Sequence, residues 1–198
     1  MAVAPSRSHC TLEGQPVPVG GTWPALGSPR VMHVVLAPTT TNRTIDLVNA
    51  IQEQQHDTVI EILEAGQDPN CQWMGRWRAE PVTHVAASRG HFYSLHLLLA
   101  GFANPNVATS DGRTALHLGV LANPPMTLHV LMDHGANVHA RDSQGATPLH
   151  FAAVTDSVAL VQQLLSAGAD PLLPDAHNDP PLSWWCGANV RAALMDSC

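Results

Sequence analysis

A phrase that returns every 33 residues is the feature of this chain that most constrains its fold. The clearest copies are residues 111–117, with the sequence Asp-Gly-Arg-Thr-Ala-Leu-His, and residues 144–150, with the sequence Gln-Gly-Ala-Thr-Pro-Leu-His. Weaker copies stand one period before and one period after these, at 78–84 and 177–183. A chain with such a period folds as a stack of one repeated unit, in which each unit buries its apolar face against its neighbours.

The phrase itself predicts a tight turn followed by a short helix. Gly112 and Gly145 supply the left-handed residue that a hairpin turn requires. Thr114 and Thr147 follow each glycine by two residues, and threonine is one of the residue types that caps a helix N-terminus.

A second helix in each unit is indicated by apolar residues three and four positions apart, the pattern of a helix with one buried face. These residues are Val59, Ile62 and Leu63; Leu95, Leu98 and Leu99; Leu128, Leu131 and Met132; and Val161, Leu164 and Leu165. Gly135 and Gly168 follow two of these helices, where glycine readily takes the left-handed conformation that ends a helix. In the unit 78–110 the aligned residue is Phe102, and Gly101 stands one place early, so we expect that helix terminus to be locally different.

The period of 33 residues, with the phrase Thr-Pro-Leu-His at 147–150, resembles the ankyrin repeat family. The resemblance covers residues 45–198 and implies an all-α solenoid of stacked helix-turn-helix units with β-hairpin tips. The predicted units are a degenerate N-terminal repeat at 45–77, full repeats at 78–110, 111–143 and 144–176, and a truncated repeat at 177–198.

The truncated last repeat carries Trp184 followed by Trp185 and Cys186, and the last two stand where Ala152 and Ala153 stand one period earlier. A stack of repeats needs a cap at each end. Either the two tryptophans close the stack as a large apolar plug, or the chain is a shortened form of a longer one.

Residues 1–43 differ from the repeats and are expected to form a disordered tail. They contain six prolines and four glycines and show no sustained helical period. The N-terminus lacks the charged-then-apolar pattern of a signal peptide, and no apolar run reaches the roughly 18 residues of a membrane span. We therefore expect no membrane association.

The net charge and the positions of the cysteines limit the kinds of partner and the cellular compartments that we expect. The net charge is −7, which disfavours binding to the phosphates of nucleic acid. The four cysteines are scattered without a Cys-x-x-Cys pair, which fits a reducing compartment, so we expect the protein in the cytoplasm, the nucleus or both. All nine basic residues are arginine.

No pattern of residues points to catalysis, a cofactor or a metal. The sequence lacks Gly-x-Ser-x-Gly, His-Glu-x-x-His and the phosphate-binding loop that ends in Gly-Lys. His84, His117 and His150 share one repeat position, which places them about 10 Å apart and too far from one another to share a zinc ion. In ankyrin repeats this histidine is structural and bonds between adjacent turns, so the resemblance implies the same role here.

The resemblance instead implies a surface for another protein, made of hairpin tips and the face of the first helices, on a monomeric chain. Aligning the repeats along this surface gives the candidate binding residues Trp73, Arg76, Trp77, Arg78, Glu80, Ser88, Arg89, Ser110, Asp111, Arg113, Leu121, Ser143, Gln144, Val154 and Thr155. The alignment also predicts two weak ion pairs, one between Arg78 and Asp111 and one between Glu80 and Arg113.

One hairpin connection is longer than the others. Asn70 and Pro81 are eleven residues apart, against eight from Asn106 to Thr114, and the three extra residues fall within 71–78. This finger contains two tryptophans, a methionine and two arginines, residue types enriched at binding hot spots. Its tryptophans either contact a partner or fold back onto the first two repeats as local core.

We therefore expect a non-catalytic adaptor or inhibitor, with two narrower alternatives. The residues at 167–170 and 177–179 are similar to the terminal repeats of some NF-kappa-B-inhibitor-like proteins, which usually have six or more repeats. The absence of lysine would suit a substrate receptor of a ubiquitin ligase, although no ligase-docking box is visible after Leu194.

Overall fold

A computed structural model of the 198-residue chain describes residues 11–12, 15–16, 43–74, 79–184 and 187–195. The chain divides into two units, Met1–Leu36 and Ala37–Cys198. The first contains one small antiparallel hairpin, β1 (Thr11–Leu12) with β2 (Gln15–Pro16). The rest of the predicted tail up to residue 42 lies outside the described residues, and its disorder stays a prediction.

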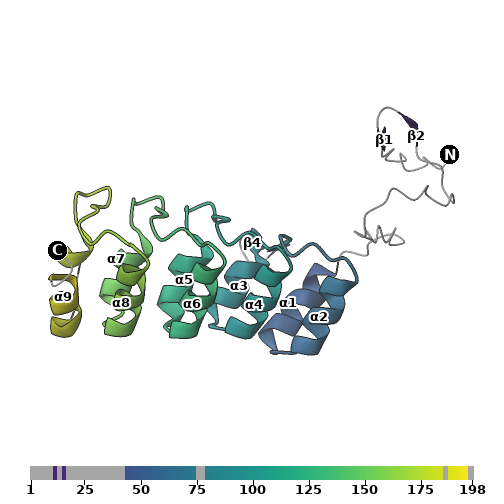
Figure 1. Ribbon diagram of the computed structural model, residues 1–198, viewed down its shortest axis with the longest axis horizontal. Helices are drawn as coiled ribbons and strands as arrows, with labels where there is room; N and C mark the ends of the chain where they lie inside the picture. Colours follow the sequence, from purple (N-terminus) through teal and green to yellow (C-terminus); the bar gives the residue numbers. More distant parts are fainter. Residues whose placement is uncertain (1–10, 13–14, 17–42, 75–78, 185–186, 196–198) are drawn as a thin grey trace, which may run out of the picture. The chain divides into compact units, whose positions relative to one another are not determined.

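The second unit is the expected all-α solenoid. Its helix pairs are stacked side by side in chain order (Figure 1). The pairs are α1 (Thr44–Gln52) with α2 (His56–Glu64), α3 (Val82–Ser88) with α4 (Phe92–Ala100), α5 (Ala115–Ala122) with α6 (Pro125–Asp133), α7 (Pro148–Val154) with α8 (Val158–Ser166), and the 3-10 helix η1 (Pro181–Ser183) with α9 (Ala188–Met195).

The second helices bury the face that their apolar spacing predicts. Eight of the twelve predicted residues are 0% exposed: Val59, Ile62, Leu95, Leu98, Leu128, Leu131, Val161 and Leu164. Leu99 is also buried, whereas Leu63, Met132 and Leu165 are half-buried at the edge of the core. Each pair thus packs its apolar stripe against the next pair, and the core runs along the stack.

The expectation of a different end for α4 is wrong. Phe102 has a φ of +67°, the left-handed conformation that Gly135 adopts with a φ of +80°. The N–H of Phe102 donates to the Leu99 carbonyl (3.0 Å) and that of Ala103 to the Leu98 carbonyl (3.0 Å), which closes the helix as in the other repeats. These two bonds, with the burial of Ala103, outweigh the strain of about 1–2 kcal/mol that a residue with a Cβ atom meets there.

The hairpin tips differ in length. In the long first connection, β3 (Gln72–Met74) pairs with β4 (Ala79–Pro81) as an antiparallel ladder that places Trp73 opposite Glu80. The next tip has a single bridge, between Ala108 and Thr114. The extra residues in the first connection therefore provide the length for a ladder, with the finger's end at 75–78 outside the described residues.

Trp184 packs against the preceding repeat, and whether the two tryptophans close the stack as a plug or the chain is a shortened form of a longer one stays a prediction. The ring centre of Trp184 lies 5.2 Å from that of His150 and 5.9 Å from that of Phe151, and its Nε1 donates to Asp175 Oδ2 (3.2 Å). Trp185 and Cys186, the other two residues of this prediction, lie outside the described residues.

In the described part of the chain, no helix has both the length and the apolar character needed to cross a membrane.

Candidate functional site

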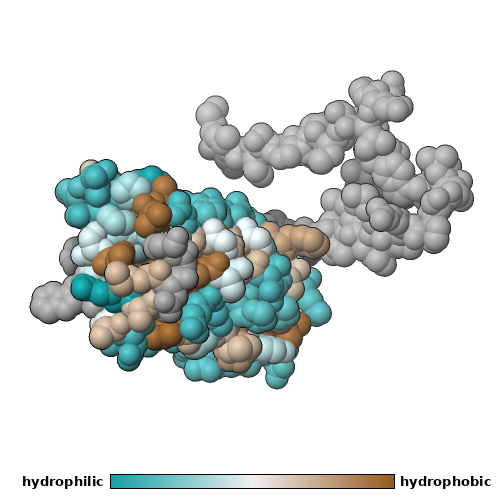
Figure 2. Space-filling view, turned by 60° about the vertical axis from the view of Figure 1, so that its left-hand side comes forward, coloured by the Kyte–Doolittle hydropathy of each residue, from teal (hydrophilic) through white to brown (hydrophobic). Residues whose placement is uncertain are grey.

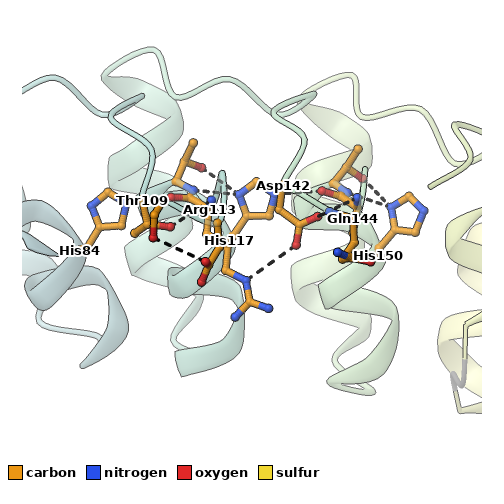
Figure 3. Close-up of polar contacts among 12 residues, drawn as sticks. His84, Thr109, Arg113, His117, Asp142, Gln144 and His150 are labelled. Carbon is orange, nitrogen blue, oxygen red and sulfur yellow. Dashed lines mark hydrogen bonds and ion pairs between the residues drawn. The ribbon is translucent and has the colours of Figure 1, made fainter. Parts of the chain in front are cut away.

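The repeated histidines connect the units of the stack (Figure 3). The backbone N–H of Thr114 donates to His117 Nδ1 (3.1 Å), and that of Thr147 donates to His150 Nδ1 (3.0 Å). Because Nδ1 accepts, the ring proton is on Nε2, which donates to the Ala146 carbonyl from His117 (3.2 Å) and to the Asp179 carbonyl from His150 (3.1 Å). Each ring thus caps its own helix and reaches into the next repeat.

His84 keeps the second of these roles without the first. Pro81 occupies the capping position and has no N–H to donate, yet His84 Nε2 bonds to the Arg113 carbonyl at 3.0 Å. Burial lowers the pKa of His84, His117 and His150, and the carbonyl acceptors oppose that shift only in part. The three rings are neutral structural groups, as the resemblance implies.

The described residues do not arrange three or more histidine, cysteine, aspartate or glutamate side chains in a way that would hold a metal ion. Cys71 is a half-buried free thiol near the finger, and burial raises its pKa. This thiol is therefore largely protonated at neutral pH and a poor nucleophile.

Buried carboxylates organise two of the tips. Asp142 Oδ1 accepts from the N–H of Gln144 (2.9 Å) and of Ala146 (3.0 Å). One period later, the Asp175 carboxylate has the same role, and the N–H groups of Asp179 and His177 lower its pKa. Each tip thus has a fixed internal geometry.

Neighbouring tips are also bonded to one another. The N–H of Ser143 donates to the Asp111 carbonyl (2.8 Å), and that of Ala176 donates to the Gln144 carbonyl (2.8 Å). A Cβ atom on Gly112, whose φ is +76°, would lie 3.0 Å from Asp142 Cα. The turn glycine therefore permits both the left-handed conformation and the close contact between repeats. Side chains on successive tips are consequently held at a fixed spacing.

The predicted residues at the ends of the first helices form an exposed row. Ser88 and Arg89 are exposed, Leu121 is 47% exposed and Val154 is 51% exposed. Thr155 is half-buried and donates its hydroxyl to a carbonyl of its own helix. The residues just before the row are fully or almost fully buried, namely Ala87, Val120 and Ala153.

A second row, which the sequence reasoning missed, lies one helical turn before this one. Leu118, Phe151 and Trp184 share one repeat position and are all half-buried. Because residues three apart lie on the same helix face, Leu118 adjoins Leu121 and Phe151 adjoins Val154. We call Leu118, Leu121, Phe151, Val154 and Trp184 the inner strip. The 33-residue period, applied to half-buried as well as exposed positions, would have found it.

The predicted tip residues flank this strip. Ser110, Ser143 and Gln144 are exposed, whereas Asp111 and Arg113 are half-buried. The expected ion pair between Glu80 and Arg113 is wrong: within the described residues, Arg113 instead faces the carboxylate of Asp142 in the following repeat, with Nε and Oδ2 3.7 Å apart. The reason is that Asp142 is held under the tip by its backbone bonds, whereas Glu80 lies in the ladder of the first hairpin.

The finger is described only at its base. Trp73 is half-buried and packs against the core, and the adjacent Met74 is 74% exposed. The predicted residues Arg76, Trp77 and Arg78 lie outside the described residues. For Trp73, the packing favours the local-core interpretation, and whether a partner also touches it stays a prediction.

The surface of the repeats mixes apolar and polar residues. Figure 2 shows hydrophobic side chains exposed among hydrophilic ones on the face turned toward the viewer. Among the described residues, Phe102 is the most exposed large apolar side chain, at 91%, and it lies at the end of α4 rather than on the inner strip. Met74 and Ile45, 74% and 66% exposed, also lie outside the inner strip.

A family model of ankyrin repeats, three copies long, matches residues 47–142 and again residues 83–175. Together the two matches span more than half of the chain. The comparison with curated proteins gave no match.

Proposed function

Because the chain belongs to the ankyrin repeat family, whose members generally bind other proteins, we propose that it binds a protein partner through the inner strip and the tips beside it. On this proposal it acts without catalysis, as an adaptor that brings proteins together or as an inhibitor that covers a partner's surface. A monomer in the cytoplasm or nucleus is part of the same proposal.

The observation that carries the proposal is the exposure of Leu121 and Val154, 47% and 51%, at equivalent positions of α5 and α7. Each directly follows a fully buried residue on a helix whose packing is already complete. Apolar side chains placed periodically on a rigid surface, with polar tips at its rim, have the composition of an interface core and its rim.

Rigidity of the surface supports the same proposal. The tips are fixed by Asp142 and Asp175, and the repeats are joined through their histidines. A surface that is already ordered loses little conformational entropy when a partner binds.

The test is partner capture by the full chain, quantified for the wild type and for the double variant Leu121→Arg with Val154→Arg. Two charges in the centre of a desolvated interface should reduce capture of the specific partner about tenfold or more. Met126→Arg is the matched control, because Met126 is 50% exposed on α6, outside the inner strip. Capture by this control should equal capture by the wild type.

Circular dichroism melts of all three proteins accompany the test. Since the changed residues are exposed, the melting temperatures should stay within a few degrees of one another. Equal capture by the double variant and the wild type would contradict the proposal, as would loss of capture with Met126→Arg alone.

A further inference from the structure

We infer that Arg113 is a receptor for a carboxylate, and that the partner presents an acidic side chain next to a large apolar one that packs on the inner strip. This inference rests on the proposed function and names the chemistry of the segment that the surface binds. Two observations carry the inference: Arg113 is held in a fixed orientation, and the N–H groups of its guanidinium have no hydrogen-bond partner among the described residues.

Arg113 is fixed at both its backbone and its side chain. Its N–H donates to Thr109 Oγ1 (3.3 Å), and its carbonyl accepts from the N–H of Thr109 (2.9 Å) and from His84 Nε2 (3.0 Å). Its Cζ lies 5.2 Å from the centre of the Phe151 ring, the geometry of a cation–π contact. The guanidinium is therefore oriented before any partner arrives, although the side chain is 40% exposed.

The hydrogen-bonding capacity of this guanidinium is unused within the described part of the chain. Its Nε is buried without a hydrogen-bond partner, since Asp142 Oδ2 stands 3.7 Å away and Oδ1 is already bonded to two backbone N–H groups. Neither Nη atom makes a hydrogen bond to a described residue, and in Figure 3 both lie away from the carboxylate of Asp142. Arg141 provides the contrast, because its Nη2 donates to the Pro174 carbonyl at 2.7 Å.

A guanidinium fork of this kind is suited to a carboxylate, which it can bind with two parallel hydrogen bonds. The nearby Asp142 side chain, 3% exposed, already supplies one negative charge. A singly charged carboxylate therefore fits the local charge better than a doubly charged phosphate does. The net charge of −7 likewise disfavours the phosphates of nucleic acid.

The residues next to the Arg113 guanidinium indicate which apolar residues the bound segment should carry beside its acidic one. Phe151 lies between Arg113 and Trp184, with ring centres of Phe151 and Trp184 5.9 Å apart, and Val154 is one helical turn further along α7. An acidic side chain on Arg113 thus places the next residues of an extended segment over aromatic and aliphatic surface. The segment expected is one with aspartate or glutamate beside leucine, isoleucine, phenylalanine or tryptophan.

The test begins with a displayed library of random peptides selected on the full chain. We expect the selected peptides to share an acidic residue next to a large apolar one. One such peptide is then synthesised with its acidic residue and with the corresponding amide, and each is titrated against wild type and Arg113→Gln. Either single change should weaken binding about tenfold, and the two together should weaken it little further, because both remove the same contact.

Two further variants keep the result interpretable. Arg113→Lys keeps the charge but not the fork, so it should bind more weakly than wild type and more tightly than Arg113→Gln. Arg191→Gln is the matched control, an exposed arginine on α9, and should bind as wild type does. The amide peptide changes nothing in the protein, so its weaker binding cannot come from misfolding.

The outcomes separate the inference from the proposed function. Peptides without an acidic residue, or additive losses from Arg113→Gln and the amide, overturn the inference. If peptides without an acidic residue bind the double variant Leu121→Arg with Val154→Arg more weakly than they bind wild type, the proposed surface stands. A library that yields no binder also overturns the inference, since a preformed site binds short segments, and partner capture still decides the proposed function.

Discussion

At the scale of single residues, one histidine position carries both the capping of a helix and the joining of two repeats. The Nδ1 atom of His117 accepts from Thr114, and Nε2 donates to Ala146. Protonation would remove the acceptor at Nδ1 and place a charge in the core. The neutral ring is therefore a condition for the stability of the stack.

This dependence predicts a loss of stability in mild acid. Burial lowers the pKa of His84, His117 and His150 below their ordinary value of 6.5, so the unfolded chain binds more protons than the folded one below that pH. The stabilising contribution is complete above pH 6.5 and is lost as the pH falls toward the folded pKa values. Melting temperature should therefore fall steadily between about pH 7 and pH 5.

Two variants test whether the buried histidine rings cause this change of melting temperature with pH. His117→Gln keeps a donor but cannot titrate, so its melting temperature should be lower at pH 7 and should change less with pH than that of wild type. His139→Gln, which changes an exposed ring, should keep the wild-type slope. A His117→Gln protein with an undiminished slope would contradict the assignment.

Phe102 illustrates strain at a single residue. It holds a φ of +67° with a side chain that is 91% exposed, so the strain brings little burial in return. Phe102→Gly should raise the free energy of unfolding by about 1 kcal/mol, because glycine takes this conformation without a Cβ clash. Chemical denaturation measures the change, and a destabilised Phe102→Gly protein would show that the ring makes contacts that favour the fold.

At the scale of elements, the junction between the two helices of a repeat depends on close contact as well as on conformation. Gly90 has a φ of +69°, and a Cβ added to it would lie 2.5 Å from Pro124 Cγ in the next repeat. Gly135, with a φ of +80°, would place its added Cβ in open space. Alanine variants at these two positions therefore distinguish the cost of backbone strain from the cost of crowding against the next repeat.

We expect Gly135→Ala to lower the free energy of unfolding by about 1–2 kcal/mol, from the left-handed strain alone. Gly90→Ala should lower it by a further 1–3 kcal/mol or so, because the proline ring cannot move without shifting α6. Denaturant titration of both variants measures the difference. Equal losses would mean that the contact between Gly90 and Pro124 relaxes freely.

The helix pairs were predictable from the sequence because their period and spacing follow directly from what each repeat must bury. The end of α4 was not predictable. Phe102 stands where Gly135 stands one repeat later, and an aromatic residue there suggests a different turn, but two backbone hydrogen bonds keep the same turn. The partner of Arg113 was missed for a related reason. Sequence rows align Glu80 with Arg113, but the backbone bonds of Asp142 place that carboxylate under the tip.

At the scale of the whole stack, each repeat contacts only its neighbours, so an end repeat depends on one interface. Trp184 contributes to that interface through its contacts with His150, Phe151 and Asp175. Trp184→Ala should destabilise the protein by about 2 kcal/mol. Hydrogen exchange should quicken first in α9 and η1, with α1 to α4 unchanged. Met195→Ala, at a position that is 61% exposed, is the control; a uniform rise in exchange across all repeats would contradict a local role.

The central claim is that the face formed by the first helices and the tips binds a protein, while the second helices support it. Hydrogen exchange of the full chain with and without its captured partner tests this claim most directly. We predict slower exchange in the partner's presence at the tips 108–114 and 142–147 and at the ends of α5 and α7. Slower exchange confined to α2, α4, α6 and α8 would contradict the account.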